Sequence, residues 1–570
     1  MPVKKPFTYY PTRYPTRVSR APVECFSGSH APSRGMMGTC EKRSIPEALK
    51  GVGLVPAGWM SGLHMVWAVT EQTINDQLKL LVNNGVIERK ITVGDLDKDD
   101  ICLTGGIGIP TVELTNPMGP KTARLKVPIV TGTAKYLERR GRTLVSKDVS
   151  ADGWCLVLRT VLNLSDKKAK VEELGKDLPE SVSKILEKFT SSDFSIQQIF
   201  LDLQNANLTS FDPDASDLGT LDPGLAALIG KGLVKYFAAS RTPGRNPYVL
   251  GYIAQAPHND PSKLQPTNAD FSLTRYRTSG GGLDVRHDRN TLNFLLMTGG
   301  QKVPVDAGNF TRNLVASGGA GTGYVAFDTL KKAWIESEIL PAFREAVVPK
   351  NTQGDSWKTE INEKWKEAKK ATWTMRTSQA RTDSRKEAEA GIWDIVAVNT
   401  QKTSLSAELK PDVRVGEYSG PGFECSGYYY YKIHAKSELG WAWKSRKLPF
   451  TVRIRFTVSD TGGITSTVTT EKGKIEENSD RSWLDIYKWL MRQKNYLDQI
   501  EELDKQYQYV QQAVFDVMSQ SLPHVLAGMS SQVVLPAPSQ FHYRSVSLDQ
   551  DLVLSATFDY RTPSPTKGRP

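Results

Sequence analysis

The densest group of side chains that could carry acid–base or metal chemistry lies at Asp284, His287 and Asp288. A histidine between carboxylates can transfer a proton or take part in a metal site. The stretch around them is polar and follows a glycine run, which is typical of a surface loop. We therefore expect a solvated loop here and no chemical step that depends on His287 or Asp288.

The sequence contains no other pattern typical of an enzyme or a metal site. It has no Gly-x-Ser-x-Gly, no His-Glu-x-x-His and no Cys-x-x-Cys. Its seven histidines are scattered singly, and its five cysteines are widely spread. A disulfide scaffold or a structural zinc site is therefore not expected. These absences predict a chain that is not an enzyme and that has no cofactor and no metal.

Three glycine-rich stretches could be taken for phosphate loops: Gly105–Gly108, Ser279–Gly282 and Gly318–Gly323. A P-loop needs a Lys-Ser/Thr pair after the glycines and a helix N-terminus at the phosphate. None of the three stretches has both. We expect tight turns and β-bulges at these glycines, not a nucleotide site.

The charge balance suits an anionic partner without identifying one. The chain has 73 basic and 62 acidic residues, a formal net charge of +11. Without a zinc-finger or RNP-like motif, specific nucleic-acid binding is not predicted. A phospholipid membrane surface and an acidic protein remain as possible anionic partners. For the membrane surface, the alternatives are a solvated tail and a connector helix packing on its own domain. The candidates for it are in a basic arm and in a Trp-bearing segment: Lys4, Lys5, Arg13, Arg17, Trp357, Trp365, Lys366, Lys369 and Lys370.

Alternating apolar residues predict most of the strands. Leu63–Val69 is suited to a buried strand, and Thr70 then takes an N-cap position before an amphipathic helix that ends at Asn84-Gly85. Further alternation follows at Leu125/Val127/Ile129, Trp154/Leu156/Leu158 and Ile199/Leu201/Leu203, and again near the C-terminus. Between the predicted strands at 154–158 and 199–203, Asp177 and Pro179 predict the start of a helix.

The longest helical pattern runs from about residue 480 to 528, which exceeds a compact domain in length. Its apolar stripe needs a long groove or a partner helix to cover it. The strand before it has one apolar and one polar face, as in antiparallel sheets. The two together supply the candidates for an apolar lipid groove: Leu497, Ile500, Leu503, Val510, Val514, Val517, Phe450, Val452, Ile454 and Phe456.

These elements predict an elongated α+β chain of long, twisted antiparallel sheets wrapped around long amphipathic helices. We expect a basic, proline-rich, disordered arm over 1–48 and a sheet/helix module over 49–347. A charged connector helix region over 348–399 and a strand-plus-helix region over 400–560 follow, before a basic tail over 561–570. The start lacks an apolar signal segment and no apolar run is long enough for a membrane span, so we expect a soluble product made in the cytoplasm, with any release by a non-classical route.

Several segments resemble the clostridial neurotoxin-accessory proteins of the tubular lipid-binding (TULIP) superfamily, namely the Orf-X proteins and their forty-seven-kilodalton companion. The similar segments occur in family order: His64–Val69 with Ile74-Asn75 and Leu78, Gly105-Gly106, Pro128–Gly132, Leu292–Thr298, Gly323–Phe343, Val534–Pro536, Phe541–Tyr543 and Leu552–Tyr560. One departure is that His64-Met65 replaces the family's Trp-Asp pair, with Trp59 displaced upstream.

The resemblance implies a TULIP-like fold with an apolar groove and a non-catalytic role. One such role is the binding of lipid, phosphoinositide or a membrane surface. Another is accessory work beside a toxin or another accessory protein, and the gene would then belong to a toxin or insecticidal locus. The alternative is a structural or assembly protein whose long helix and basic arm dock on a partner protein. Co-purified lipid would favour the first function, and a stoichiometric oligomer would favour the second.

Overall fold

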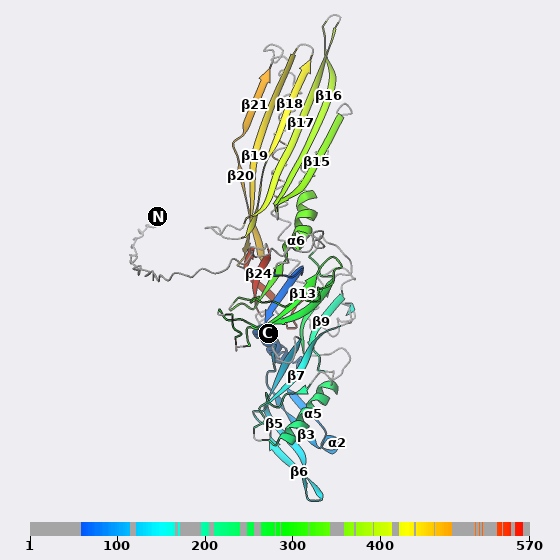
Figure 1. The fold of residues 1–570 in the computed structure, drawn as a ribbon, viewed down its shortest axis with the longest axis vertical. Helices are drawn as coiled ribbons and strands as arrows, with labels where there is room; N and C mark the ends of the chain where they lie inside the picture. The colour runs from blue at the N-terminus through cyan, green and yellow to red at the C-terminus, as the bar shows by residue number, and fades with distance from the viewer. Residues whose placement is uncertain are drawn as a thin grey trace, which may run out of the picture. The chain divides into compact units, whose positions relative to one another are not determined.

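The computed structural model describes 59–114, 121–165, 169–170, 195–203, 210–219, 221–239, 248–255, 264–279, 281–284, 287–316, 318–341, 358–369, 372–390, 393–412, 421–437, 440–460, 462–481, 505, 508, 512, 516, 533–537, 540–548 and 553–561. These residues form three antiparallel sheets and a few helices (Figure 1). The predicted antiparallel, sheet-rich class is confirmed.

The six-stranded sheet joins segments from both ends of the described chain. Its strands are β1 (Met65–Thr70), β12 (Asn268–Thr274), β13 (Thr291–Met297), β14 (Gly321–Val325), β23 (Gln540–Leu548) and β24 (Leu554–Arg561). Their spatial order is β12-β13-β1-β14-β24-β23. Every residue of β1 is buried, as expected for a central strand rich in apolar side chains.

Two glycines let this sheet pack closely. A Cβ atom on Gly321 would overlap the ring of Phe558 and lie 2.7 Å from the Ala68 carbonyl oxygen. A Cβ atom on Gly323 would lie 3.2 Å from the Trp67 ring. The Trp67 and Phe558 rings are 5.3 Å apart, and they fill the space that side chains at Gly321 and Gly323 of β14 would need.

The eleven-stranded sheet contains the strands predicted in the first half of the chain. Its main order is β2-β3-β5-β7-β9-β11-β22, and four short strands pair at its sides. Leu125, Val127 and Ile129 are all buried on one face of the 19-residue strand β5, which confirms the predicted alternation. The strands are β2 (Lys90–Val93), β3 (Ile101–Ile107), β4 (Thr111–Glu113), β5 (Thr122–Arg140), β6 (Thr143–Ser150), β7 (Cys155–Leu164), β8 (Ala169–Lys170), β9 (Ser195–Leu201), β10 (Ser210–Phe211), β11 (Val249–Gln255) and β22 (Val533–Val534).

Helix α1 (Glu71–Asn83) begins and ends where the sequence predicts. The Thr70 hydroxyl accepts a hydrogen bond from the Thr73 amide at 3.2 Å, and Gly85 has a φ of +74° just past the C-cap. Further helices among the described residues are α2 (Leu96–Asp99), α5 (Pro223–Ala239), α6 (Phe327–Leu330) and the π-helix η2 (Lys331–Ile339). The helix predicted from Asp177 lies outside the described residues.

The seven-stranded sheet is a meander of long strands. It consists of β15 (Lys358–Lys369), β16 (Thr372–Ala390), β17 (Trp393–Asp412), β18 (Gly422–Ser437), β19 (Gly440–Val458), β20 (Ile464–Lys472) and β21 (Glu476–Arg481). Strands β15 to β20 follow in chain order, and β21 pairs with β19. The ring of Phe327 lies 5.6 Å from that of Trp373, and the ring of Trp334 lies 4.8 Å from that of Phe423. Helices α6 and η2 therefore cover one end of its apolar face.

The charged connector helix predicted within 348–399 is wrong, because 358–369 and 372–390 are the strands β15 and β16. The prediction rested on an apolar residue every four positions, at Trp357, Ile361 and Trp365. A spacing of four keeps residues on one side of a helix, but four is also a multiple of the strand period of two. The pattern could not separate the two structures, and the pairing of β15 with β16 decides for the strand.

The long helix predicted over about 480–528 is mostly outside the described residues. Strand β21 continues to Arg481, so the first positions of the predicted helix belong to the sheet. Lys505, Gln508, Gln512 and Asp516 are helical, and the Gln512 side chain donates to Asp516 at 2.8 Å. The apolar stripe of this range is not described, and its burial stays a prediction.

Candidate functional site

The four lipid-groove candidates on β19 are brought together on one buried face. Phe450, Val452, Ile454 and Phe456 are each at most 2% exposed. Neighbouring strand β18 adds Phe423, whose ring centroid is 6.1 Å from that of Phe456. The remaining groove candidates lie outside the described residues: Leu497, Ile500, Leu503, Val510, Val514 and Val517. The structure thus shows the β19 residues as core.

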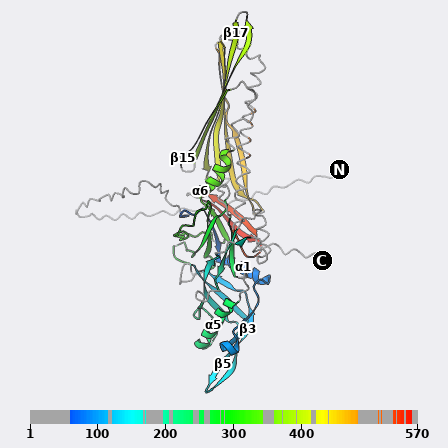
Figure 2. The same ribbon diagram turned by 90° about the vertical axis from the view of Figure 1, so that its right-hand side faces the viewer.

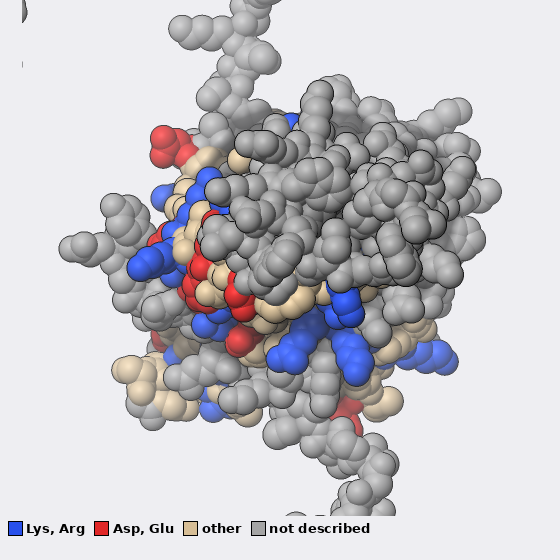
Figure 3. Space-filling view, turned by 90° about the horizontal axis from the view of Figure 1, so that it is seen from above, with Lys and Arg blue, Asp and Glu red and all other residues tan. Residues whose placement is uncertain are grey.

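The other face of β19 is charged and paired. Arg453 donates to Glu424 at 2.8 Å and also pairs with Glu471, while Lys410 lies 3.0 Å from Glu424. Burial acts to raise the pKa of Glu424, but the hydrogen bonds from Arg453 and Lys410 outweigh it and hold the pKa below its usual value. The paired face of β19 therefore lacks the single sign of charge that binding to an anionic surface would need. In the view from above, basic and acidic side chains also lie next to one another along one flank of the described surface (Figure 3).

The predicted anionic-surface residues do not form a described site. Lys4, Lys5, Arg13, Arg17, Trp357 and Lys370 lie outside the described residues. Trp365, Lys366 and Lys369 belong to β15, so the helix face on which the prediction placed them does not exist.

The polar trio at 284–288 supports the start of helix α1. The Gln72 amide donates to the Asp288 carbonyl at 3.0 Å, and the Glu71 amide donates to the Asn290 carbonyl at 2.7 Å. Asp284 is only 8% exposed, so the expectation of a fully solvated loop is wrong at that residue. The backbone of this loop supplies the acceptors that a helix N-terminus requires.

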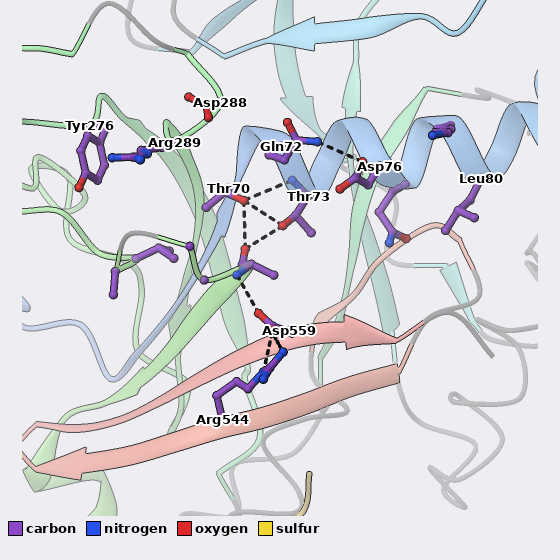
Figure 4. A pocket seen from close by; sticks show the side chains of 17 residues that line it. Thr70, Gln72, Thr73, Asp76, Leu80, Tyr276, Asp288, Arg289, Arg544 and Asp559 are labelled. Atoms are coloured by element: carbon purple, nitrogen blue, oxygen red, sulfur yellow. Dashed lines mark hydrogen bonds and ion pairs between the residues drawn. The ribbon is translucent and has the colours of Figure 1, made fainter. Parts of the chain in front are cut away.

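A cleft of about 660 Å³ lies beside the start of α1, next to the glycine run at 318–321 (Figure 4). Its polar groups already bond to one another. The Thr70 amide donates to the Ala320 carbonyl at 3.0 Å, and the Ala320 amide donates to Asp559 at 3.3 Å. Asp559 also pairs with Arg544. Because these amides have partners within the chain, the glycine run does not form a phosphate-binding nest.

A second depression, which we name the α5 groove, has a different character. Its volume is about 720 Å³, and it lies between the outer part of β5, the end of β6 and the first turns of α5. Asp222 caps the helix by accepting from the Gly224 amide at 2.8 Å, which fixes the helix start at this wall. Its apolar lining consists of Tyr136, Leu137, Val149, Trp154, Leu218, Leu221, Leu225 and Leu228.

The α5 groove is apolar inside and has three charged lining residues: Glu138, which pairs with Arg140 and Lys147, Asp222, which caps α5, and Arg139. Leu218 and Leu225 are 8% and 7% exposed, whereas Leu228 is 37% exposed. Arg139 lines the groove and is itself exposed.

Our sequence analysis missed this site. The spacing of Leu218, Leu221, Leu225 and Leu228 was a usable signal for a one-sided apolar stripe, but nothing local to β5 indicates that this stripe lies against it.

A buried acidic pair joins α1 to β4. Glu71 is 5% exposed and accepts from the Leu114 amide at 2.8 Å. Its burial raises the pKa of Glu71 to about 8, and the nearby Glu113 carboxylate adds to this shift. Glu113 is in turn 3.1 Å from Lys126 and 3.2 Å from the His287 ring.

No group of three or more His, Cys, Asp or Glu side chains among the described residues is placed to hold a metal ion. In the same part of the chain, no helix is both long and apolar enough to cross a membrane.

Comparison with known proteins gives similarity of fold at a low level. No family model and no curated protein sequence matches the chain. Among solved structures, it is similar to P47 from Clostridium botulinum A2, with 10% identity, a TM-score of 0.43 and coverage of 87% of this chain and 97% of the other. It is also similar to P47 of Clostridium botulinum E1, with 11% identity, a TM-score of 0.45 and coverage of 88% and 99%.

A lipopolysaccharide binding protein is a further similar structure, with 8% identity, a TM-score of 0.29 and coverage of 88% and 99%. Because all three TM-scores lie below 0.5, these similarities establish neither a family nor a function.

Proposed function

We propose that this chain is a non-catalytic lipid-binding protein and that the α5 groove holds the apolar part of the lipid. The observation that carries the proposal is the groove's leucine-rich lining, partly open at Leu228, beside the exposed Arg139, while the two lining carboxylates, Glu138 and Asp222, already have partners within the chain. Its volume of about 720 Å³ is within the range of small-molecule sites, which are mostly apolar with few polar groups. An acyl chain suits such a lining, and an anionic head group suits Arg139.

Two finer expectations stay part of this proposal. One is a TULIP-like arrangement in which the sheets wrap a long helix, since most of the helical range lies outside the described residues. The other is accessory work beside a toxin, which rests on the sequence resemblance alone.

The test is binding of a fluorescent fatty acid to the full chain without vesicles, with native mass spectrometry of organic extracts to find co-purified lipid. We expect saturable binding that Leu228→Glu weakens, because a carboxylate placed at the opening opposes entry of an apolar chain. Leu283→Glu is the matched control, since Leu283 is 46% exposed and does not line the groove. No saturable binding by the wild-type chain, or equal loss in both variants, would refute the assignment of the groove.

A further inference from the structure

The hairpin of β5 and β6 extends beyond the sheet that carries it. Strand β3 pairs with β5 only as far as Tyr136, whereas β6 pairs with β5 from Thr133 to Arg140. From Leu137 to Ser146 the two strands therefore have only each other as described sheet neighbours. Both ribbon views show β5 and β6 projecting as a two-stranded ribbon at the lower end (Figures 1 and 2). We name residues 137–147 the basic hairpin.

A tight turn holds the end of the basic hairpin. Arg140 pairs with Thr143, which leaves Gly141 and Arg142 as the two-residue turn. Gly141 has a φ of +65°, and a glycine with positive φ at the first central position is typical of a type II′ hairpin turn. All residues from Arg139 to Ser146 are exposed. The turn thus presents a defined, solvent-exposed tip.

The charge of the basic hairpin is strongly one-sided. It contains four basic residues, Arg139, Arg140, Arg142 and Lys147, and one acidic residue, Glu138. Glu138 is shared by Arg140 at 3.0 Å and Lys147 at 2.8 Å. Arg139 donates to the Gly141 carbonyl at 3.3 Å, and no described carboxylate forms an ion pair with Arg139 or Arg142. Two guanidinium groups at the tip are therefore open to an anion.

Apolar side chains are exposed between these charges. Leu144 is 63% exposed and Val145 is 40% exposed. As neighbours in a strand they point to opposite faces of the hairpin, so both faces have an apolar side chain in water. A protein docking on one face would cover only one of them. A lipid interface surrounds the tip and covers both, while the arginines remain level with the head groups.

The connection between β20 and β21 shows that exposure alone does not give this pattern. Ile475 there is 54% exposed and lies near Lys472 and Lys474. Three glutamates, at 471, 476 and 477, more than balance those lysines. Because β20 and β21 both pair with β19, this connection is an exposed bulge on one sheet edge, and it has the apolar side chain without the excess positive charge, which makes it a control.

We infer that the basic hairpin docks on an anionic membrane surface, with Leu144 and Val145 inserted among the lipids and Arg139 and Arg142 bound to head-group phosphates. This inference rests on the proposed function, because Leu137, Glu138 and Arg139 belong both to the hairpin and to the α5 groove. Docking at the tip places the rim of the groove at the bilayer, where a lipid can pass between membrane and protein.

The test is flotation of the full chain with vesicles of phosphatidylcholine alone or mixed with phosphatidylserine, at low and high salt. We expect binding to the anionic vesicles that weakens with salt. Arg142→Gln, which does not line the α5 groove, should weaken it roughly five-fold, because a basic residue at a membrane surface contributes about 1 kcal/mol. Leu144→Ser should weaken it about ten-fold through lost apolar burial. All of these side chains are exposed, so the thermal unfolding of the variants should match that of the wild type.

Lys472→Gln/Lys474→Gln and Ile475→Ser are the matched controls and should bind as the wild type does. Fatty-acid binding without vesicles separates the two proposals. Hairpin variants that lose vesicle binding and keep fatty-acid binding support the inference. Vesicle binding that is unchanged in the hairpin variants, or that falls equally in the controls, overturns it and leaves the groove in place. If the chain binds anionic vesicles through the hairpin but does not bind fatty acid, the proposed lipid site in the α5 groove is refuted and the docking inference stands.

Discussion

The buried carboxyl of Glu71 predicts an unusual dependence of stability on pH. Glu71 is 5% exposed, and burial raises its pKa from 4.5 to about 8. The charged and titratable groups near Glu71 and its neighbour Glu113 include Arg124, Lys126 and His287. Below pH 4.5 the carboxyl is protonated in both the folded and the unfolded chain. Between pH 4.5 and 8 the unfolded chain releases this proton and the folded chain keeps it, so the free energy of unfolding falls as pH rises.

The magnitude follows from the width of that interval. Each pKa unit corresponds to about 1.4 kcal/mol. Between about pH 5.5 and 7.5 the Glu71 carboxyl should therefore lower the free energy of unfolding by about 2.5 kcal/mol, which is about half of the full effect. The change Glu71→Gln replaces it with a neutral group that can still accept from the Leu114 amide. The variant should lack this pH-dependent loss and be the more stable protein at pH 7.5.

Urea unfolding of the full chain at several pH values, followed by tryptophan fluorescence, measures the effect. The quantity to compare is the difference between wild type and Glu71→Gln, because other groups titrate equally in both chains. Glu336→Gln is the control, since Glu336 is 46% exposed and forms a long surface ion pair of 3.7 Å with Lys331, which contributes little to stability. Parallel pH profiles for wild type and Glu71→Gln would show that the Glu71 carboxyl is ionised in the folded chain and would refute the reasoning.

Two further stability predictions follow from single contacts. Gly321→Ala should lower the free energy of unfolding by about 1–3 kcal/mol because the added Cβ would overlap the Phe558 ring. Gly282→Ala is the control and should change it little, since its Cβ would lie 3.6 Å from the nearest atom. Equal losses for the two variants in urea unfolding would contradict this prediction. Asp212→Asn should cost about 1.5–3 kcal/mol, since this fully buried carboxylate accepts two hydrogen bonds of 2.6 Å from Arg159. Glu477→Gln, which breaks an exposed pair, should cost less than about 1 kcal/mol in the same measurement.

Local sequence patterns were sufficient wherever one face of an element is buried and its ends have their own chemistry. Helix α1 is an example, because Thr70 supplies the cap and Ile74, Leu78 and Leu81 supply the buried stripe. Strand β5 is another, since the strict alternation over residues 122–129 fits a strand and not a helix. In both cases the information lies within a few residues of the feature that it predicts.

The same reasoning failed where the pattern has two interpretations or where distant segments meet. Residues 358–369 fit helix and strand equally by their apolar spacing, and only the pairing of β15 with β16 and of β16 with β17 decides. The α5 groove needs β5 and α5, which are more than 80 residues apart, to face each other. No period within either segment encodes that contact, so the candidate site moved from the predicted residues on β19 to this groove.

The glycine run at 318–323 shows how partners decide between two meanings of one pattern. A phosphate loop requires free backbone amides that converge on a cavity. Here the Ala320 amide donates to Asp559, and the carbonyl of Ala320 accepts from the Thr70 amide. Gly321 and Gly323 then enter β14, where the rings of Phe558 and Trp67 occupy the space of a side chain. The glycines thus serve the packing of β14 between β1 and β24, and the cleft beside them has no converging set of free amides among its described residues that could hold a phosphate.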